Sequence, residues 1–199
     1  MKRKIIGVVF IVIGLSIIGT ALFMRYSAER VQNAMLEDFE KTLQEVDKQV
    51  ENSSVDNVNN VDNEDSKVIS GAIGIMEIPK IDLKVAVGEG VDNKTLKYAA
   101  GHFEGTAMPG EKGNFAVAGH RSYTYSQYFN RLDELEEGDE VIVKTTKGEY
   151  TYKVFEKKVV EPSEVSVLDK TKDATITLVT CTPIRVATHR LIVKGKLAE

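Results

Sequence analysis

Residues 140–155 read EVIVKTTKGEYTYKVF, and this stretch gives the strongest local indication of the fold. Two runs rich in β-branched and aromatic residues, 140–146 and 149–155, meet at Lys147-Gly148. Such runs favour strands, and glycine readily adopts the backbone conformations that a tight connection requires. The stretch therefore predicts a β-hairpin.

The rest of residues 68–199 has the same sequence pattern, in which short apolar runs are bounded by Gly, Pro and Asp. We expect strands near 72–78, 81–87, 114–118, 140–146, 149–159, 174–180 and 186–195, and short helices at 94–100 and 124–132. Many strands with little helix favour an all-β fold. A closed or nearly closed, antiparallel-rich β-barrel is expected, because closure removes exposed strand edges. A β-sandwich is the alternative.

The N-terminal region contains a long uncharged segment, Ile5 to Met24. As a helix it would span about 30 Å of hydrocarbon, so we predict a transmembrane anchor at 5–24. Lys2, Arg3 and Lys4 precede it, which places the N-terminus in the cytoplasm and the rest of a single-pass protein outside the cell. A cleaved signal peptide is the alternative, but its apolar core is usually shorter, about 7 to 15 residues.

Between the anchor and the β region, apolar residues recur at helical spacing, which predicts a helix with one apolar stripe. The stripe comprises Leu36, Phe39, Leu43, Val46 and Val50. It indicates either a short coiled coil or a helix that folds back on its own domain or on the membrane surface. Residues 52–66 read NSSVDNVNNVDNEDS and predict a flexible acidic linker.

Four regions follow from this organisation. We expect a basic cytoplasmic tail at 1–4, the anchor at 5–24, a helical stalk with its linker at 25–67, and a β-barrel domain at 68–199.

Charge and cysteine content narrow the functional classes. The net charge is −4, and residues 66–199 carry 19 basic and 19 acidic side chains, so no basic surface for nucleic acid is expected. The one cysteine, Cys181, cannot form an internal disulfide. With three histidines and no CxxC or HExxH spacing, we expect no metal and no cofactor.

Cys181 follows the strand-like run 174–180, and Pro183 cannot continue a strand ladder, so the thiol is predicted at a strand end. A thiol with a reference pKa of about 8.5 is only a few per cent ionised near pH 7, so a catalytic cysteine needs a base or cation nearby. His120 and Arg190 are the candidates. Alternatively, Cys181 is a small buried hydrophobic residue.

Three segments resemble the signature regions of sortases, the membrane-bound transpeptidases of Gram-positive bacteria. These are NFAVAGHR at 114–121, TLVTCTP at 177–183 and THRL at 188–191. The similarity extends to GIMEIP at 74–79, GHFEGT at 101–106 and YSQYFNRLDELEEGD at 125–139, and covers roughly residues 70–199. It implies a sortase-type β-barrel of about eight strands with two or three short helices.

The resemblance also implies roles for individual residues. Cys181 would be the nucleophile that forms a thioester, and His120 the general acid and base that protonates the departing amine. Arg190 would be the cation near the scissile carbonyl, where its N–H groups can stabilise an oxyanion. Thr180 is a further candidate, because its hydroxyl or its backbone N–H could donate to that oxyanion.

Other polar residues are expected to have structural roles. Strand residues alternate between faces, so His189 should point away from Cys181 if Arg190 points toward it. His102 lies in a Gly-flanked loop, where a stabilising hydrogen bond is expected. Arg121 and Arg185 are expected to be solvated surface charges.

By the same resemblance, the substrates are secreted proteins with an LPXTG-like sorting signal cut after Thr, and the acceptor is an amine of the cell-wall peptide. The Asp-Pro-aromatic lid motif of the pilin-polymerising class does not occur. The chain therefore resembles class D most, although residues 188–195 are reminiscent of the pilin class.

Three alternatives to this function stay open. The first is a pilin-type (class C-like) sortase that joins its substrate to a Lys amine. The second is another cysteine acyl-transfer enzyme, papain-like or an L,D-transpeptidase. The third is a non-catalytic membrane-tethered β-barrel that binds a wall component.

Overall fold

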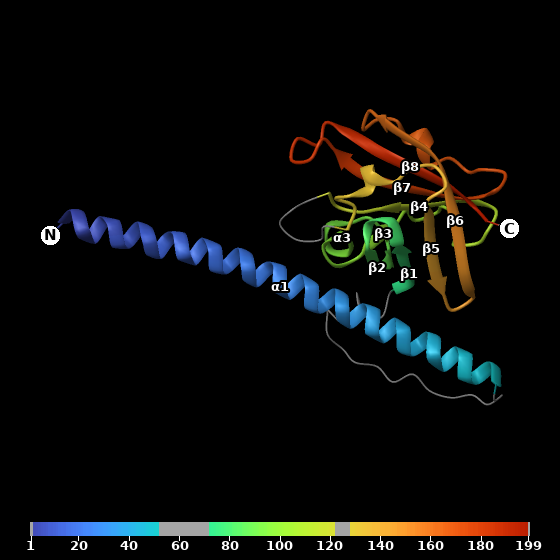
Figure 1. Ribbon diagram of the computed structural model, residues 1–199, viewed down its shortest axis with the longest axis horizontal. Coiled ribbons are helices and arrows are strands. Elements are labelled where there is room, and N and C mark those ends of the chain that lie inside the picture. The colour runs from blue at the N-terminus through green and yellow to red at the C-terminus, as the bar shows by residue number, and fades with distance from the viewer. Residues whose placement is uncertain (1, 52–71, 122–127, 199) are drawn as a thin grey trace.

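The computed structural model describes residues 2–51, 72–121 and 128–198. A long N-terminal helix, α1, runs beside a β-barrel and extends well beyond it (Figure 1). In chain order the main elements are α1 (Lys2–Glu51), β1 (Ala72–Ile78), β2 (Leu83–Glu89), α3 (Asn93–Tyr98), β3 (Ala100–His102), β4 (Gly113–Ala118), β5 (Glu140–Thr145), β6 (Gly148–Val160), β7 (Ala174–Thr182) and β8 (His189–Leu197). Short 3-10 helices lie at Pro79–Ile81, Leu132–Glu134 and Val165–Leu168.

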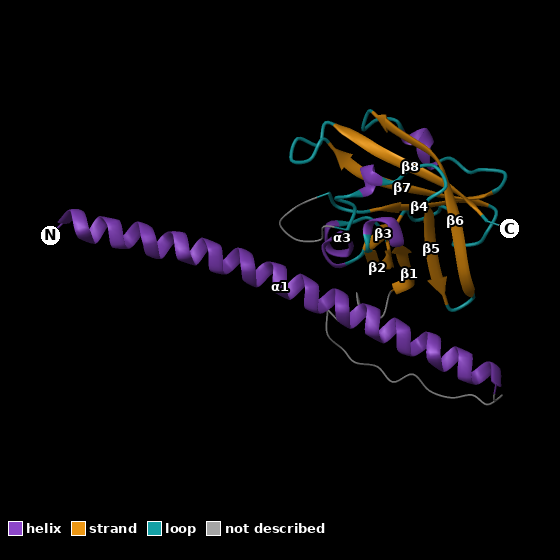
Figure 2. Ribbon diagram, viewed as in Figure 1, coloured by secondary structure: helices purple, strands orange, loops and turns teal. Residues whose placement is uncertain are grey.

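The eight strands close into a barrel in the order β1-β2-β3-β4-β7-β8-β6-β5. Figure 2 shows the strands grouped together with little helix among them. Their buried side chains form one hydrophobic core. The β2–β3 and β4–β7 pairs are parallel, and the other neighbouring strands are antiparallel. The predicted closed, antiparallel-rich barrel is therefore confirmed, and the β-sandwich alternative is wrong.

Side-chain alternation decides which residues of the barrel wall face the core. In β7, Ile176 and Leu178 lie in the hydrophobic core, as do Leu191 and Val193 of β8. The pairing of these two strands has a regular register, so successive residues alternate between the two faces. Val179 and Cys181 consequently lie on the outer face of β7.

The predicted hairpin is confirmed, with one shift. Thr145 of β5 pairs with Gly148 of β6, so the connecting residues are Thr146 and Lys147. This places the turn one residue earlier than the sequence indicated. Gly148 has a φ of 145°, a conformation that disfavours other residues.

Two expectations for local structure were wrong. The sequence analysis missed β3, which has only three residues and is too short to show alternation. The helix expected at 124–132 lies partly outside the described residues; its described part forms turns at 128–131 and then begins the 3-10 helix Leu132–Glu134. Phe129, Leu132 and Leu135 are all fully buried, so their helix-like spacing comes from turns that pack into the core.

Helix α1 is continuous through the apolar segment and the predicted stalk, and it is long and apolar enough to cross a membrane, judged by length and composition. The second half of α1 packs against the barrel. Met35 is fully buried against Ala86 of β2 and Ala99, and Val31 and Leu36 pack beside it.

Of the predicted apolar stripe, Phe39 is buried, and the side chains of Val46 and Val50 lie outside the described set. The interpretation as a helix docked on its own domain therefore describes this structure, in which no second chain is present. The predicted linker at 52–66 also lies outside the described residues.

Candidate active site

The parallel pair β4–β7 brings two of the predicted site residues together. Its register runs from Gly113 opposite Ala174 to Ala118 opposite Val179. The Gly119 N–H then donates to the Val179 carbonyl over 3.1 Å. His120 and Cys181 each lie two residues beyond the last pair of this register, Ala118 and Val179, so continuing the register sets them opposite one another.

The chain just before His120 is shaped by close packing. A Cβ atom at Gly119 would lie 2.7 Å from the Phe129 ring, which is nearer than ordinary contact. Glycine therefore allows the buried ring to pack directly under this turn of the chain. The Phe129 N–H also donates to the His120 carbonyl over 3.1 Å, which fixes the backbone that carries the imidazole.

Arg190 reaches the same place from β8, where it is the direct antiparallel partner of Cys181. Opposite residues in an antiparallel pair present their side chains on one face, so both lie on the outer face of the barrel wall. The Arg190 Nη1 donates to the carbonyls of Ala187 and His189, at 3.2 and 3.0 Å. The guanidinium therefore already binds peptide carbonyl oxygens.

Burial of the imidazole lowers the pKa of His120, because desolvation disfavours the charged ring. The neutral form, which can accept a proton, is favoured at neutral pH. Cys181 is half-buried and has a free thiol. An imidazole and a thiol, both partly exposed, thus lie near the ends of two paired strands.

The prediction for the Thr180 hydroxyl is wrong. Thr180 is only 2% exposed, and its hydroxyl donates to the Gly119 carbonyl over 2.7 Å. A hydroxyl has one proton, so it cannot also donate to an oxyanion in this arrangement. The hydroxyl instead joins β7 to the end of β4, and the proposal for the Thr180 backbone N–H stays a prediction.

The prediction that Arg121 is a surface charge is also wrong. Arg121 is 8% exposed, and its Nη2 pairs with the Asp133 carboxylate at 2.7 Å. Nη1 donates to the Thr182 hydroxyl over 2.7 Å, and Nε to the Asn130 carbonyl over 3.4 Å. Arginine is usually exposed, so no sequence signal indicated this burial.

The remaining residues singled out from the sequence lie as expected. Arg185 is exposed. His189 pairs with Thr182, and its Nε2 lies 3.1 Å from the Glu161 carboxylate. This ion-pair contact is consistent with a side chain that turns away from Cys181.

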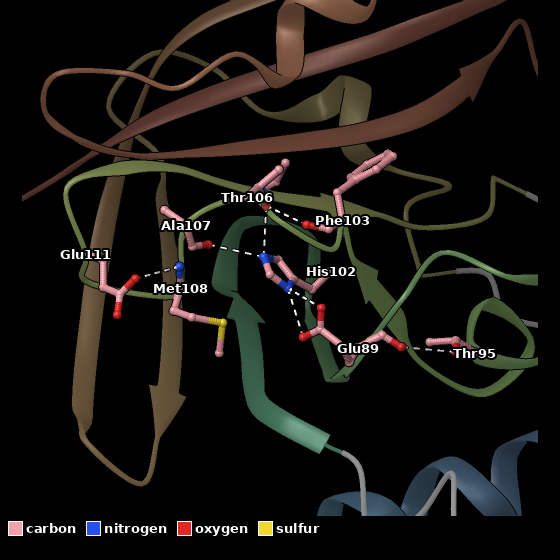
Figure 3. A network of polar contacts seen from close by, with 9 residues as sticks. Glu89, Thr95, His102, Phe103, Thr106, Ala107, Met108 and Glu111 are labelled. Carbon is pink, nitrogen blue, oxygen red and sulfur yellow. Dashed lines mark hydrogen bonds and ion pairs between the residues drawn. The ribbon is translucent and has the colours of Figure 1, made fainter.

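His102 is the last residue of β3 and does not lie in the loop where it was predicted, but its ring forms the predicted stabilising contacts (Figure 3). The ring is 2% exposed, and its Nδ1 lies 3.0 Å from both carboxylate oxygens of Glu89. Its Nε2 lies 2.8 Å from the Thr106 hydroxyl and 3.2 Å from the Ala107 carbonyl. His102 therefore fixes the loop between β3 and β4 and is separate from the group at Cys181.

No group of three or more His, Cys, Asp or Glu side chains in residues 2–51, 72–121 and 128–198 is placed to hold a metal ion. The chemistry that this site offers is that of a thiol, an imidazole and a guanidinium.

The family model of the sortase domain matches residues 76–198, which is more than half of the chain. The chain belongs to the sortase family. Sortases are cysteine transpeptidases, and the match spans β4, β7 and β8, the three strands that position His120, Cys181 and Arg190.

Individual relatives agree with this assignment. The chain is 39% identical over 141 residues to Sortase SrtE1 of Streptomyces coelicolor and 35% identical over 130 residues to Sortase D of Bacillus subtilis. Each match covers 63% of this chain. The chain spans 40% of the length of the Streptomyces protein and 63% of that of the Bacillus protein.

Among solved structures, a Clostridium perfringens Sortase D5 transpeptidase superposes with a TM-score of 0.67 and 34% identity. The match covers 85% of this chain and 99% of that one. Sortase C1 of GBS Pilus Island 1 has a TM-score of 0.69 and 25% identity, and the match covers 84% of this chain and 92% of that one.

Proposed function

We propose that this sortase is a membrane-anchored cysteine transpeptidase that cleaves an LPXTG-like sorting signal after Thr and transfers the protein to an amine of the cell wall. The observation that carries the proposal is the strand register. Cys181 pairs with Arg190 across β7 and β8, and continuing the β4–β7 register by two residues from Ala118 and Val179 leads to His120 and Cys181, which supports a site built from these three residues.

The acylation half-reaction uses Cys181 and His120. The Cys181 sulfur attacks the Thr carbonyl carbon while His120, favoured in its neutral form, accepts the thiol proton. The imidazolium then donates this proton to the amide nitrogen. The C–N bond breaks, the amine leaves, and a thioester remains on Cys181.

The second half-reaction runs the same steps in reverse. An acceptor amine attacks the thioester carbonyl carbon, and neutral His120 takes a proton from the amine nitrogen. A C–N bond forms, the C–S bond breaks, and the proton returns to the sulfur. The enzyme is regenerated without any external reductant or oxidant.

Arg190 is proposed to bind the reacting carbonyl. In the resting protein its Nη1 binds the carbonyl oxygens of Ala187 and His189. A substrate carbonyl presents the same kind of acceptor, so exchange of Ala187 for substrate preserves the hydrogen bond. In the tetrahedral intermediate the acceptor becomes an oxyanion, and the bond to a permanently charged guanidinium strengthens.

The class D assignment is supported by identity and coverage together. The Clostridium Sortase D5 structure is 34% identical over 85% of this chain, whereas Sortase C1 is 25% identical over 84% of this chain. The pilin-type alternative, in which a Lys amine is the acceptor, is favoured by a fold likeness to Sortase C1 and by residues 188–195, which are reminiscent of the pilin class. We therefore propose a wall-peptide amine as the acceptor.

The proposed topology places residues 5–24 across the membrane, the N-terminus in the cytoplasm and the barrel domain, 68–199, outside. The apolar, solvent-exposed first half of α1 supports this arrangement. A client with its own membrane segment would share the same surface, which raises the effective concentration of the two proteins.

The test uses the full chain in detergent micelles with a fluorogenic LPXTG peptide, with and without an amine acceptor. We expect cleavage that Cys181→Ala abolishes, and a ligated product when the amine is present. His120→Ala and Arg190→Ala should each lower kcat by about 10²-fold or more, because each removes a group that acts in the transition state.

Each alternative has its own outcome in the same assay. Ligation to a pilin Lys peptide in preference to a wall-peptide amine would favour the pilin-type enzyme. Absence of cleavage across varied sorting signals, by a folded protein, would contradict the proposed activity and favour the wall-binding barrel. Arg131→Ala serves as the control, since its guanidinium pairs with Glu134 away from Cys181.

A further inference from the structure

Arg121, the residue after His120, has all three of its guanidinium nitrogens engaged. Nη1 binds the Thr182 hydroxyl, Nη2 the Asp133 carboxylate, and Nε the Asn130 carbonyl. The side chain is 7% exposed. Burial of a charge is costly unless the charge is paired and hydrogen-bonded, and here both conditions are met.

These contacts join two chain segments beyond the end of their backbone pairing. The last backbone bond between β4 and β7 in this region runs from Gly119 to Val179. Beyond it, the connection is continued by the side-chain bond from Arg121 to Thr182. Arg121 follows His120 and Thr182 follows Cys181, so this bond links the neighbours of the proposed base and nucleophile.

The segment 129–135, which supplies the other two partners of Arg121, is itself anchored in the core. Asn130 and Asp133 lie between Phe129 and Leu135, both fully buried. Phe129 also donates its N–H to the His120 carbonyl. The guanidinium is thus held between the end of β7 and a segment that is itself fixed to the barrel interior.

We propose that Arg121 is a positioning residue that holds His120 in line with Cys181 by bonding Thr182 and Asp133 at once. The inference rests on the proposed function, in which these two residues exchange a proton. A misplacement of about 1 Å in such a pair can cost about 10²-fold in rate. Lysine cannot replace the arginine, because a single ammonium lacks the planar fork that reaches both partners.

The experiment compares Arg121→Met, Arg121→Lys and Thr182→Val in the full chain in detergent micelles. Three quantities are measured: kcat and KM for LPXTG peptide cleavage, the pH dependence of Cys181 alkylation by iodoacetamide, and Tm. Arg131→Met is the matched control, because it removes a guanidinium from the same segment that pairs with Glu134 at 2.7 Å.

Arg121→Met is expected to lower kcat by about 10²-fold with KM changed by less than about threefold. Its alkylation profile should approach that of His120→Gln, since the imidazole no longer lies beside the thiol. Thr182→Val should act in the same direction by about tenfold, and Arg121→Lys should not restore kcat. Arg131→Met should lower Tm and leave kcat and the alkylation profile unchanged.

The inference is overturned if Arg121→Met or Thr182→Val lowers Tm but keeps the wild-type kcat and alkylation profile. Should Arg121→Met fail to fold, the nearly isosteric Thr182→Val decides alone. Should the wild-type protein cleave no peptide, the proposed function fails, and the alkylation profile still shows whether Arg121 couples His120 to Cys181. The two failures are therefore distinguishable.

Discussion

His120 is half-buried at the end of β4, and this position has a consequence for stability. Desolvation lowers the pKa of the folded imidazole, whereas the unfolded chain keeps an ordinary pKa of about 6.5. As the pH falls through this value, the unfolded chain binds more protons at this residue than the folded one. The folded state must therefore lose stability toward acid pH at this site.

We predict that His120→Gln reduces this acid sensitivity. Between about pH 7.5 and about pH 5.5, the free energy of unfolding should fall more for the wild-type protein than for the variant, because Gln does not titrate. Denaturant unfolding of the full chain in micelles at several pH values measures the difference. If the free energy of unfolding fell by the same amount in both proteins over this pH range, the prediction would be contradicted.

The residues of the site differ in how far the sequence could predict them. Cys181 was placed at a strand end because Pro183 limits β7, so a local pattern was enough. The role of Arg190 came from the resemblance to sortases, and its pairing with Cys181 is seen only in the structure. The burial of Arg121 depends on Thr182, a partner 61 residues away. The bond from the Thr180 hydroxyl to Gly119 spans the same separation. No local pattern encodes such contacts.

At the scale of elements, the parallel pair β4–β7 positions the site. The strands themselves were predictable, because runs such as 174–180 are rich in β-branched residues bounded by turn residues. Their parallel pairing was not, since composition does not specify which strands become neighbours. The short β3 was also missed, because three residues are too few to show the alternation of a strand. The turns at 128–131 were missed because apolar residues spaced three apart, such as Phe129 and Leu132, fit a helix as well as a series of turns.

The β4–β7 junction should depend on the Thr180 hydroxyl. Thr180→Val keeps the shape of the side chain and removes its bond to the Gly119 carbonyl. We expect a loss of about 1 to 2 kcal/mol in the free energy of unfolding, because a buried acceptor loses its donor. Urea unfolding measures the change.

Thr146→Val is the matched control, since Thr146 is exposed in the β5–β6 turn. A surface substitution of this kind should change stability by no more than about 0.5 kcal/mol. Equal effects of the two substitutions would show that the Thr180 bond does not stabilise the junction.

At the scale of the whole molecule, helix α1 is attached to the barrel as well as continuous with the apolar segment. Met35 fills a site formed by Ala86 and Ala99, and Gln32 donates to the Lys84 carbonyl over 3.1 Å. These contacts therefore fix the orientation of the barrel relative to α1. The apolar stripe predicted a helix with a partner, but the partner surface includes small residues, such as Ala86, that gave no signal.

Met35→Glu should release the helix from the barrel, because it places a carboxylate against two alanines. We expect trypsin to cleave at Arg30 and Lys41 about tenfold faster, which corresponds to about 1.4 kcal/mol of lost docking free energy. Asn33→Glu, an exposed position on the same turn, should leave cleavage unchanged. Equal cleavage of both variants would contradict the docking described here.

The separation of His120 and Cys181 along the chain also governs when the thiol acquires its partner during biosynthesis. β4 and β7 are neighbours in the barrel, yet β5 and β6 lie between them in the chain. Contacts between distant segments form late, because the loop between them must first be ordered. A chain that is still being synthesised therefore carries the imidazole of His120 before its partner, and the two side chains come together only when the last strands are complete.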